Sequence, residues 1–354
     1  MRSIKILLPL IILLVFVACK KNIDPPVVTI PDNLKNGMLV LNEGLFQLNN
    51  SSLTWVDLAS GTENNEFFTQ KTGRLLGDTG NDMKRYGGKI YIVVNVSSTI
   101  EVLDAFTGKP VKQVSMLNGS VSKQPRSIAF YGNKAFIPCF DGYVDVLDTA
   151  SLEIVQRIAV GTNPESIAID GQRAFVTNSG GLNTPVMDST VSVIDVNALT
   201  EITKITVGKN PGAIVSDGQG SIYVVARGNY SSIPSRMKKI SASALTVTAT
   251  YPFDAGGLEM IPGNYMLVSY TGTQASQVGL FNTGSGILED PSLLDLSNVQ
   301  TLYSVQYNAA SNRIYVLDAM GYTNTGYIRV YNMSGNYINS YHVGLNPNSI
   351  LFYE

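Results

Sequence analysis

The sequence predicts an all-β fold, a seven-bladed β-propeller of four-stranded blades in which the C-terminal strand joins the first blade. Three observations lead to this prediction. The chain is rich in Gly (32) and Tyr (18) and only 15% of its residues are charged, a composition typical of strands and tight turns. A strand-rich unit recurs along the chain, and the last segment begins such a unit without completing it.

Each unit consists of an apolar strand, a tight turn with Gly or Asn, a second strand, a variable loop, a third strand and a fourth strand. Gly and Asn suit the turns because two-residue hairpins need positive φ. Successive third strands end 41 to 50 residues apart, at Asp57, Asp104, Asp148, Asp195, Ser241, Asn282 and Asn332. This period is much longer than that of a β-helix, and a sandwich would not keep the four-strand unit.

The strands can be placed from these repeats. First strands are expected near residues 82–86, 126–130, 165–169, 212–216, 258–261 and 302–307. Second strands are expected at residues 38–42, 90–95, 135–139, 174–178, 222–226, 265–270 and 314–318. Third strands are expected at residues 53–57, 100–104, 143–148, 191–195, 237–241, 278–282 and 328–332.

The missing first strand is expected at the C-terminus. The opening Val-Gly-x-Asn-Pro occurs at residues 160–164, 207–211 and 343–347, and only the last copy has no unit after it. Residues 349–353 therefore supply the innermost strand of the first blade, which removes an open sheet edge. The connection Asn346-Pro347-Asn348 is then expected beside Glu43.

The N-terminal segment is predicted to be a lipoprotein signal peptide. Arg2 and Lys5 precede an apolar run at residues 6–17, which is too short to span a membrane comfortably. The end of this run resembles a bacterial lipobox, so residues 1–18 would be removed and Cys19 lipidated; the alternative is an ordinary secretory signal with a chance Cys. Residues 19–36 contain three prolines and are expected to be a tether, and residues 37–354 the propeller.

Composition and residue types argue against several function classes. The formal net charge is −2, and no basic surface for nucleic acid is apparent. The single histidine, His342, cannot build a His-based triad or a multi-His metal site. Cys139 follows an apolar strand and is expected in the core or lining the pore, and the third-strand Asp residues are expected to accept hydrogen bonds from turn N–H groups. We therefore expect no catalysis, no metal and no cofactor.

Loop length distinguishes the two faces of the predicted ring. Loops between second and third strands are long at residues 43–52, 179–190, 227–236, 271–277 and 319–327. They open on the same face as the inter-blade connections, and variable loops on a rigid scaffold often bind ligands. A large polar ligand with flat surfaces would suit the aromatic, amide and charged side chains expected on this face. These candidate ligand-binding residues are Glu43, Phe46, Asn95, Arg126, Asn178, Arg227, Tyr230, Glu259, Tyr270, Asp318 and Tyr322.

The repeats resemble those of the YVTN-repeat, YncE-like propellers. The resemblance covers residues 37–354 and rests on the Val-Gly-x-Asn-Pro openings, on Ala174-Phe175-Val176-Thr177-Asn178 and on Val191-Ser192-Val193-Ile194-Asp195. Leu41-Asn42-Glu43-Gly44 and residues 88–95 resemble a subgroup of Bacteroidetes lipoproteins that includes the surface propeller that captures cobamides.

This resemblance implies a location, a ligand and a partner. It implies an outer-membrane lipid-anchored protein, at the cell surface or facing the periplasm, that binds a corrinoid such as vitamin B12 and delivers it to a TonB-dependent transporter. The chain would act as a monomer or as part of an outer-membrane complex. Two alternatives stay open: a protein- or glycan-binding scaffold, and an enzyme such as a lyase or an oxidoreductase.

Overall fold

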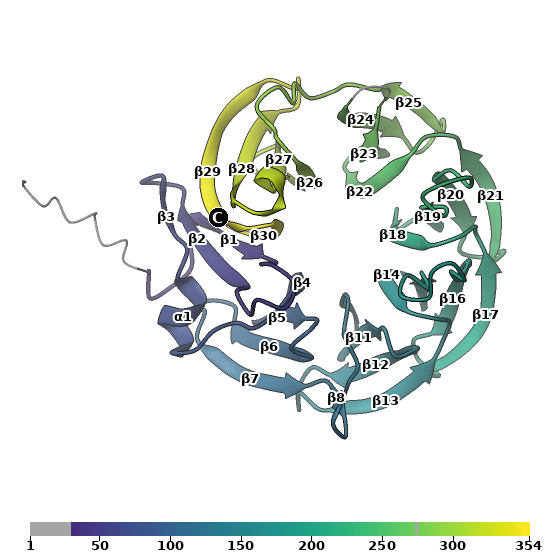
Figure 1. Ribbon diagram of the computed structural model, residues 1–354, viewed down its shortest axis with the longest axis horizontal. Helices are drawn as coiled ribbons and strands as arrows, with labels where there is room; N and C mark the ends of the chain where they lie inside the picture. Colours follow the sequence, from purple (N-terminus) through teal and green to yellow (C-terminus); the bar gives the residue numbers. More distant parts are fainter. Residues whose placement is uncertain (1–29, 273–274) are drawn as a thin grey trace, which may run out of the picture.

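Seven four-stranded antiparallel sheets stand around a central opening as the blades of a propeller, which confirms the predicted fold class (Figure 1). The computed structural model describes residues 30–272 and 275–354. The predicted signal peptide, Cys19 and most of the predicted tether lie outside the described residues. Within the described part of the chain, no helix is both long and apolar enough to cross a membrane.

The first three blades contain the following strands, given from the centre of the ring outward. Blade 1 is β30 (Pro347–Tyr353), β1 (Gly37–Asn42), β2 (Ser52–Asp57) and β3 (Thr62–Asn64). Blade 2 is β4 (Gly80–Tyr86), β5 (Lys89–Val94), β6 (Thr99–Asp104) and β7 (Pro110–Ser115). Blade 3 is β10 (Ala129–Tyr131), β11 (Lys134–Cys139), β12 (Tyr143–Asp148) and β13 (Ile154–Ala159).

The other four blades follow in chain order. Blade 4 is β14 (Pro164–Asp170), β15 (Arg173–Asn178), β16 (Thr190–Asp195) and β17 (Thr200–Thr206). Blade 5 is β18 (Pro211–Ser216), β19 (Ser221–Ala226), β20 (Arg236–Ser241) and β21 (Thr246–Tyr251). Blade 6 is β22 (Ala255–Ile261), β23 (Tyr265–Thr271), β24 (Ser276–Asn282) and β25 (Ile287–Asp290). Blade 7 is β26 (Leu302–Asn308), β27 (Arg313–Asp318), β28 (Thr325–Asn332) and β29 (Tyr337–Leu345).

The C-terminal strand closes the ring as predicted. β30 pairs antiparallel with β1, with Tyr353 opposite Gly37 and Ile350 opposite Val40. The side chains of Ile350 and Tyr353 are buried, and the Tyr353 ring lies 5.6 Å from that of Trp55. The Glu43 N–H donates to the Asn346 carbonyl at 2.9 Å, so the predicted neighbourhood of these two residues is confirmed.

The core lies between the blades rather than within one sheet. Val40 of blade 1 packs in one cluster with Leu317 and Val330 of blade 7, and similar clusters join other neighbouring blades. Second strands are therefore apolar on both faces, since each face meets a neighbouring sheet. Cys139 is fully buried in such a cluster, as expected, and burial raises the pKa of its thiol.

Residues near the N-terminal end of the described chain pack on blades 1 and 2. Ile30 lies against the blade 1–blade 2 core, and Leu34 is buried in it with its N–H donating to the Phe106 carbonyl at 2.6 Å. The folded unit thus includes several residues that the sequence assigned to the tether.

Three small elements were not predicted. Helix α1 (Phe67–Thr72) buries Phe67 and Phe68 in the core and ends at Gly73, which adopts φ 73°. A two-stranded hairpin of β8 (Leu117–Asn118) and β9 (Val121–Ser122) and a 3-10 helix η1 (Met320–Tyr322) lie in connections. These pieces are too short for hydrophobic periodicity to reveal them.

The third-strand Asp residues have the structural role that the sequence predicts. Oδ1 of Asp57 accepts from the N–H groups of Ala59 and Ser60, each at 2.9 Å, and Oδ1 of Asp195 accepts from the N–H groups of residues 197 and 198. These N–H groups hold the pKa of both carboxyls below the ordinary value. His342 is exposed on β29.

Candidate functional site

One face of the ring carries both the long loops and the inter-blade connections, and we call it the loop face. Backbone hydrogen bonds show that the two kinds of segment lie together. The Arg227 N–H, at the start of the β19–β20 loop, donates to the Asn210 carbonyl of an inter-blade connection at 3.1 Å. The Gly180 N–H of the β15–β16 loop donates to the Thr162 carbonyl of another connection at 2.9 Å.

Seven equivalent residues, one from each blade, surround the channel at the loop face. Each directly follows a residue that pairs with the end of the second strand of its blade. Six are the second residue of the innermost strand, and the seventh lies shortly before that strand. We call this set the mouth ring. In blade order it consists of Asn348, Asn81, Arg126, Glu165, Gly212, Gly256 and Tyr303.

Hydrogen bonds and ion pairs link the mouth ring through blades 1 to 5. Asn348 Nδ2 donates to the Asn81 carbonyl at 2.9 Å, and Arg126 donates to Asn81 Oδ1 at 2.8 Å. A second nitrogen of Arg126 lies 3.9 Å from Glu165. These contacts tie adjacent blades together at the channel mouth.

The mouth-ring residue of blade 5, Gly212, has no side chain, and the side chain of Arg227 occupies its place. Arg227 follows β19, and its guanidinium lies on Gly212, where an added Cβ would be 2.2 Å from Cζ. Arg227 donates two hydrogen bonds to Glu165, at 2.7 and 3.1 Å. Burial alone would raise the pKa of Glu165, but Arg227 and Arg126 hold it below the ordinary value.

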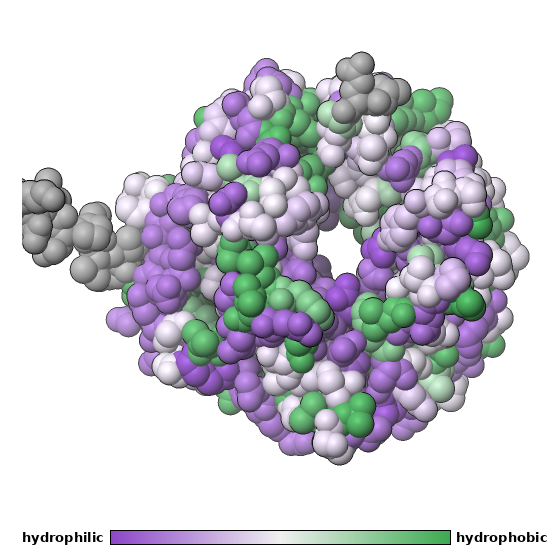
Figure 2. Space-filling view, in the orientation of Figure 1, coloured by the Kyte–Doolittle hydropathy of each residue, from purple (hydrophilic) through white to green (hydrophobic). Residues whose placement is uncertain are grey.

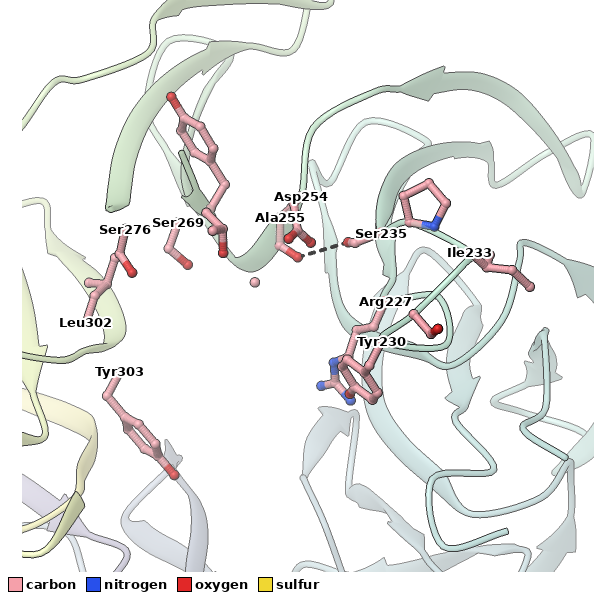
Figure 3. A pocket seen from close by; sticks show the side chains of 15 residues that line it. Arg227, Tyr230, Ile233, Ser235, Asp254, Ala255, Ser269, Ser276, Leu302 and Tyr303 are labelled. Carbon is pink, nitrogen blue, oxygen red and sulfur yellow. Dashed lines mark hydrogen bonds between the residues drawn. The ribbon is translucent and has the colours of Figure 1, made fainter. Parts of the chain in front are cut away.

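The ring is interrupted at blade 6 because Gly256 has no side chain. A Cβ built there has no neighbour closer than 3.8 Å. A cavity of about 710 Å³ opens at this point, between the β19–β20 loop and the start of blade 7 (Figure 3). It is lined by Arg227, Tyr230, Ser231, Ile233, Pro234, Ser235, Asp254, Ala255, Gly256, Ser269, Tyr270, Thr271, Ser276, Leu302 and Tyr303. We call it the mouth cavity.

The walls of the mouth cavity come from different blades, and Figure 3 shows Arg227 and Tyr230 across the space from Tyr303. Tyr230 is 73% exposed and its hydroxyl accepts from Asn210 Nδ2 at 2.9 Å. Tyr303 donates its hydroxyl hydrogen to Glu43 Oε2, and burial raises its pKa. The Tyr322 ring stands 6.0 Å from the Tyr303 ring in a T-shaped arrangement.

The cavity continues into the central channel. Ser269 and Tyr303 line both the mouth cavity and a space of about 250 Å³ below it. Asp82, Lys84 and Glu259 also line this lower space. Glu259 Oε1 accepts from the Tyr307 N–H of the next blade at 3.2 Å, and burial raises the pKa of its carboxyl.

The structure brings together some of the predicted ligand-binding residues. Arg227, Tyr230 and Tyr270 line the mouth cavity. Glu43 and Tyr322 contact its wall through Tyr303, and Arg126 belongs to the mouth ring. Glu259 lies lower, in the channel, and Phe46 is 68% exposed on the β1–β2 loop.

Three predicted residues are buried and serve the fold instead. Asn95 Nδ2 donates to the Pro125 carbonyl at 3.0 Å, and Asn178 Nδ2 donates to hydroxyls on the third strand of its own blade, each at 2.9 Å. Asp318 accepts from the N–H groups of the inter-blade connection and from Arg329 at 3.1 Å. In the sequence, a polar residue at the end of a second strand is easily taken for a residue of the loop face. In the structure, these three side chains bond to neighbouring strands and connections of the propeller.

Sequence reasoning missed Glu165, Tyr303 and Gly256. A signal for the first of these was present in the repeats: Glu165 directly follows the Pro of a Val-Gly-x-Asn-Pro opening, as do Gly212 and Asn348. Aligning the residue after that Pro would have identified these three members of the mouth ring. The other four blades lack the opening, and the strand pairing reveals Gly256 and Tyr303.

The described residues do not form a metal centre that can be recognised. Across residues 30–272 and 275–354, no three or more His, Cys, Asp or Glu side chains gather in a way that could hold a metal ion.

Comparison with solved structures supports the fold alone. A quinoprotein alcohol dehydrogenase-like protein from Bacteroides thetaiotaomicron is 17% identical, with a TM-score of 0.70, covering 90% of this chain and 79% of that one. A hydrazine synthase from Kuenenia stuttgartiensis is 18% identical, with a TM-score of 0.59, covering 72% of this chain and 76% of that one. The computationally designed Ika8 protein is 12% identical, with a TM-score of 0.56, and the match covers 88% of each chain.

At the level of sequence, no curated protein matches the chain. A family described as a domain of unknown function, DUF5074, matches residues 36–352, which is nearly the whole propeller. The chain therefore belongs to the DUF5074 family, and its match to that family coincides with the seven-bladed ring.

Proposed function

We propose that this chain is a non-catalytic lipoprotein of the bacterial cell envelope that binds a ligand in the mouth cavity. The observation that carries the proposal is the interruption of the mouth ring at Gly256. Hydrogen bonds and ion pairs link the ring through blades 1 to 5, whereas here a cavity of about 710 Å³ is left open. That volume lies in the range of small-molecule sites.

The lining favours a large polar ligand with flat surfaces. Tyr230 and Tyr303 offer aromatic faces from opposite walls, and Arg227 and several serines offer hydrogen-bond donors. A corrinoid has this chemistry, and the resemblance to cobamide-capturing propellers favours it over other ligands. We propose that the chain captures a corrinoid and delivers it to a TonB-dependent outer-membrane transporter.

The proposal assigns binding without chemistry. Two of the charged side chains at the mouth are held by polar partners: Arg227 by the carboxylate of Glu165, and Glu43 by the hydroxyl of Tyr303. Groups held this way are suited to fixing the shape of a site. A rigid closed ring lets the loops converge on a ligand with little loss of conformational freedom.

Calorimetric titration of cyanocobalamin into the chain that begins at Lys20 tests the proposal. We expect binding heat at micromolar ligand. The variant Gly256→Leu should weaken this binding by placing a side chain in the cavity, and Gly88→Leu is the matched control. Gly88 lies in a turn on the opposite face, and its added Cβ would also have no neighbour within 3.8 Å. No heat with the unsubstituted chain, or equal heat with Gly256→Leu, would rule out corrinoid binding in this cavity.

A second candidate is a protein-binding scaffold that uses the same face. Large apolar side chains stand exposed at loop tips, and Figure 2 shows apolar groups beside the central opening. Phe46, Leu182, Val186 and Tyr230 are among the most exposed of these. This candidate predicts that an outer-membrane partner co-purifies with the chain, and that trimming residues 227–236 abolishes the association. Glycan-array binding with the same loop dependence would indicate a glycan ligand instead.

The membrane anchor is a separate part of the proposal. Labelling cells with a fatty-acid analogue should tag the chain, and Cys19→Ser should remove the tag. Protease treatment of intact cells then distinguishes surface attachment, in which the propeller is cleaved, from attachment that faces the periplasm.

A further inference from the structure

The mouth ring contains more positive than negative charge. Two guanidinium groups, those of Arg126 and Arg227, approach a single carboxylate, that of Glu165. Both point a nitrogen at the same oxygen, Glu165 Oε1, at 3.9 and 2.7 Å respectively. Arg227 takes the place of Gly212 and the other ring members are neutral, so two guanidinium groups share one carboxylate within the ring.

Arg126 is the less well paired of the two. Its strongest hydrogen bond is to the neutral Asn81 side chain, at 2.8 Å. Its Nε is buried without a hydrogen-bond partner. A partly buried guanidinium usually pairs bidentately with a carboxylate or phosphate, because its N–H groups form a planar fork.

Both guanidinium groups are held in place and still reach solvent. Arg126 lies over the Phe140 ring, 4.6 Å from its centroid, and Arg227 lies on the backbone of Gly212. Their side chains are 21% and 29% exposed. The Phe140 side chain and the backbone of Gly212 thus hold the two guanidinium groups in place. A ligand group would meet N–H donors that are already positioned.

Among residues 30–272 and 275–354, Glu165 is the one carboxylate that forms an ion pair with either guanidinium group. Glu43 accepts the hydroxyl hydrogen of Tyr303, and Asp254 is exposed on the wall formed by blade 6. Lower in the channel, Asp82 pairs with Lys84 instead, with Oδ1 of Asp82 3.6 Å from Nζ of Lys84.

We propose that Arg126 and Arg227 form an oxyanion subsite at the mouth of the channel, which receives a phosphate or carboxylate group of the ligand. The subsite would bind the anion at the exposed edges of the two guanidinium groups, beside the wall of the mouth cavity. The inference rests on the proposed function only in taking the mouth cavity as the ligand site. It limits the ligand to molecules that carry an oxyanion.

Phosphorus NMR of inorganic phosphate, titrated with the chain that begins at Lys20 at constant ionic strength, tests the subsite. We expect the phosphate resonance to broaden with the unsubstituted chain. Arg126→Gln should weaken binding about tenfold or more, the loss expected for a charge-assisted hydrogen bond. The control Lys134→Gln removes a positive charge at the start of β11, on the opposite face, and should leave binding unchanged.

Arg126→Lys keeps the experiment decisive if Arg126→Gln does not fold. It retains the charge but loses the planar fork, so binding should weaken less than in Arg126→Gln but remain measurably below that of the unsubstituted chain. No broadening with the unsubstituted chain, or equal broadening with folded Arg126 variants, overturns the subsite.

The subsite and the corrinoid proposal can fail independently. Phosphate binding that depends on Arg126, in a chain that gives no heat with cyanocobalamin, would support the subsite and refute the corrinoid. Cyanocobalamin binding that Gly256→Leu weakens but Arg126→Gln leaves unchanged would support the corrinoid and refute the subsite.

Discussion

Removing the C-terminal strand is expected to unfold the whole propeller. Truncation after Leu345 deletes β30, which contributes the innermost strand of blade 1. The deletion leaves one edge of β1 without a partner and exposes the blade 7–blade 1 core. Blade 1 can then no longer close the ring.

The size of the effect follows from the side chains that are lost. Ile350 and Tyr353 are 3% and 5% exposed, respectively. Loss of a buried Ile side chain costs about 2–5 kcal/mol and loss of a large aromatic about 3–5 kcal/mol. Together this is on the order of 5–10 kcal/mol, which is comparable to the total free energy of unfolding of an ordinary domain, about 5–15 kcal/mol.

Thermal unfolding followed by circular dichroism measures this effect. We expect the truncated chain to show no cooperative transition, and Ile350→Ala to lower the free energy of unfolding by about 2–5 kcal/mol. Ile338→Ala on β29 is the control, because that side chain is 40% exposed and its loss should change stability by no more than about 0.5 kcal/mol. A truncated chain that melts cooperatively at the temperature of the full chain would refute the closure.

Three further predictions concern individual side chains. Lys123→Met should lower the free energy of unfolding in urea by about 3 kcal/mol, because it removes one partner from the fully buried carboxylate of Asp145; an unchanged urea midpoint would contradict this. Burial raises the pKa of Glu259, so the folded state keeps that proton at pH values where the unfolded chain has lost it, and stability falls as pH rises above the ordinary glutamate pKa. Glu259→Gln should therefore flatten this part of the pH profile of stability and be at least as stable as the unsubstituted chain at pH 7, which urea titrations at several pH values can check. Gly212→Ala should displace the Arg227 guanidinium and weaken ligand binding while leaving the ring folded, and equal affinity in calorimetry would argue against that contact.

Much of the fold was predictable because each sequence repeat contains the strands and turns of one blade. The turn glycines, the apolar second strands and the unfinished last unit each depend on local spacing, and local spacing determines which strands pair. Ring closure followed from two observations: the last Val-Gly-x-Asn-Pro opening has no unit after it, and the Pro-rich segment before Met38 leaves no first strand for the first unit. Helix α1 was missed because six residues give too few turns to establish a periodicity.

The site was predictable only in part, because it depends on which blades face one another. Arg227 and Tyr230 could be assigned to a long loop and Tyr270 to the end of a second strand, and all three line the cavity. The mouth cavity itself results from the absence of a side chain at Gly256. The sequence contains 32 glycines, and nothing in it distinguishes Gly256 from the others. Only the pairing of β22 with β23 places Gly256 in the mouth ring.

Asn178 illustrates the opposite error. Its position at the end of a second strand is close to the loop face, yet its side chain turns inward and bonds to the third strand. Arg126 and Arg227 show a further limit of the sequence, because they are far apart along the chain and the packing of blades 3, 4 and 5 brings both to Glu165.

Hydrogen–deuterium exchange with and without cyanocobalamin tests most directly whether a ligand binds at the mouth of this propeller. The proposal predicts that ligand slows exchange in residues 227–236, 254–257 and 302–304, which line or border the mouth cavity, and that Gly256→Leu reduces the difference. Exchange that slows only in the turns of the opposite face, or does not change at all, would contradict the proposed site.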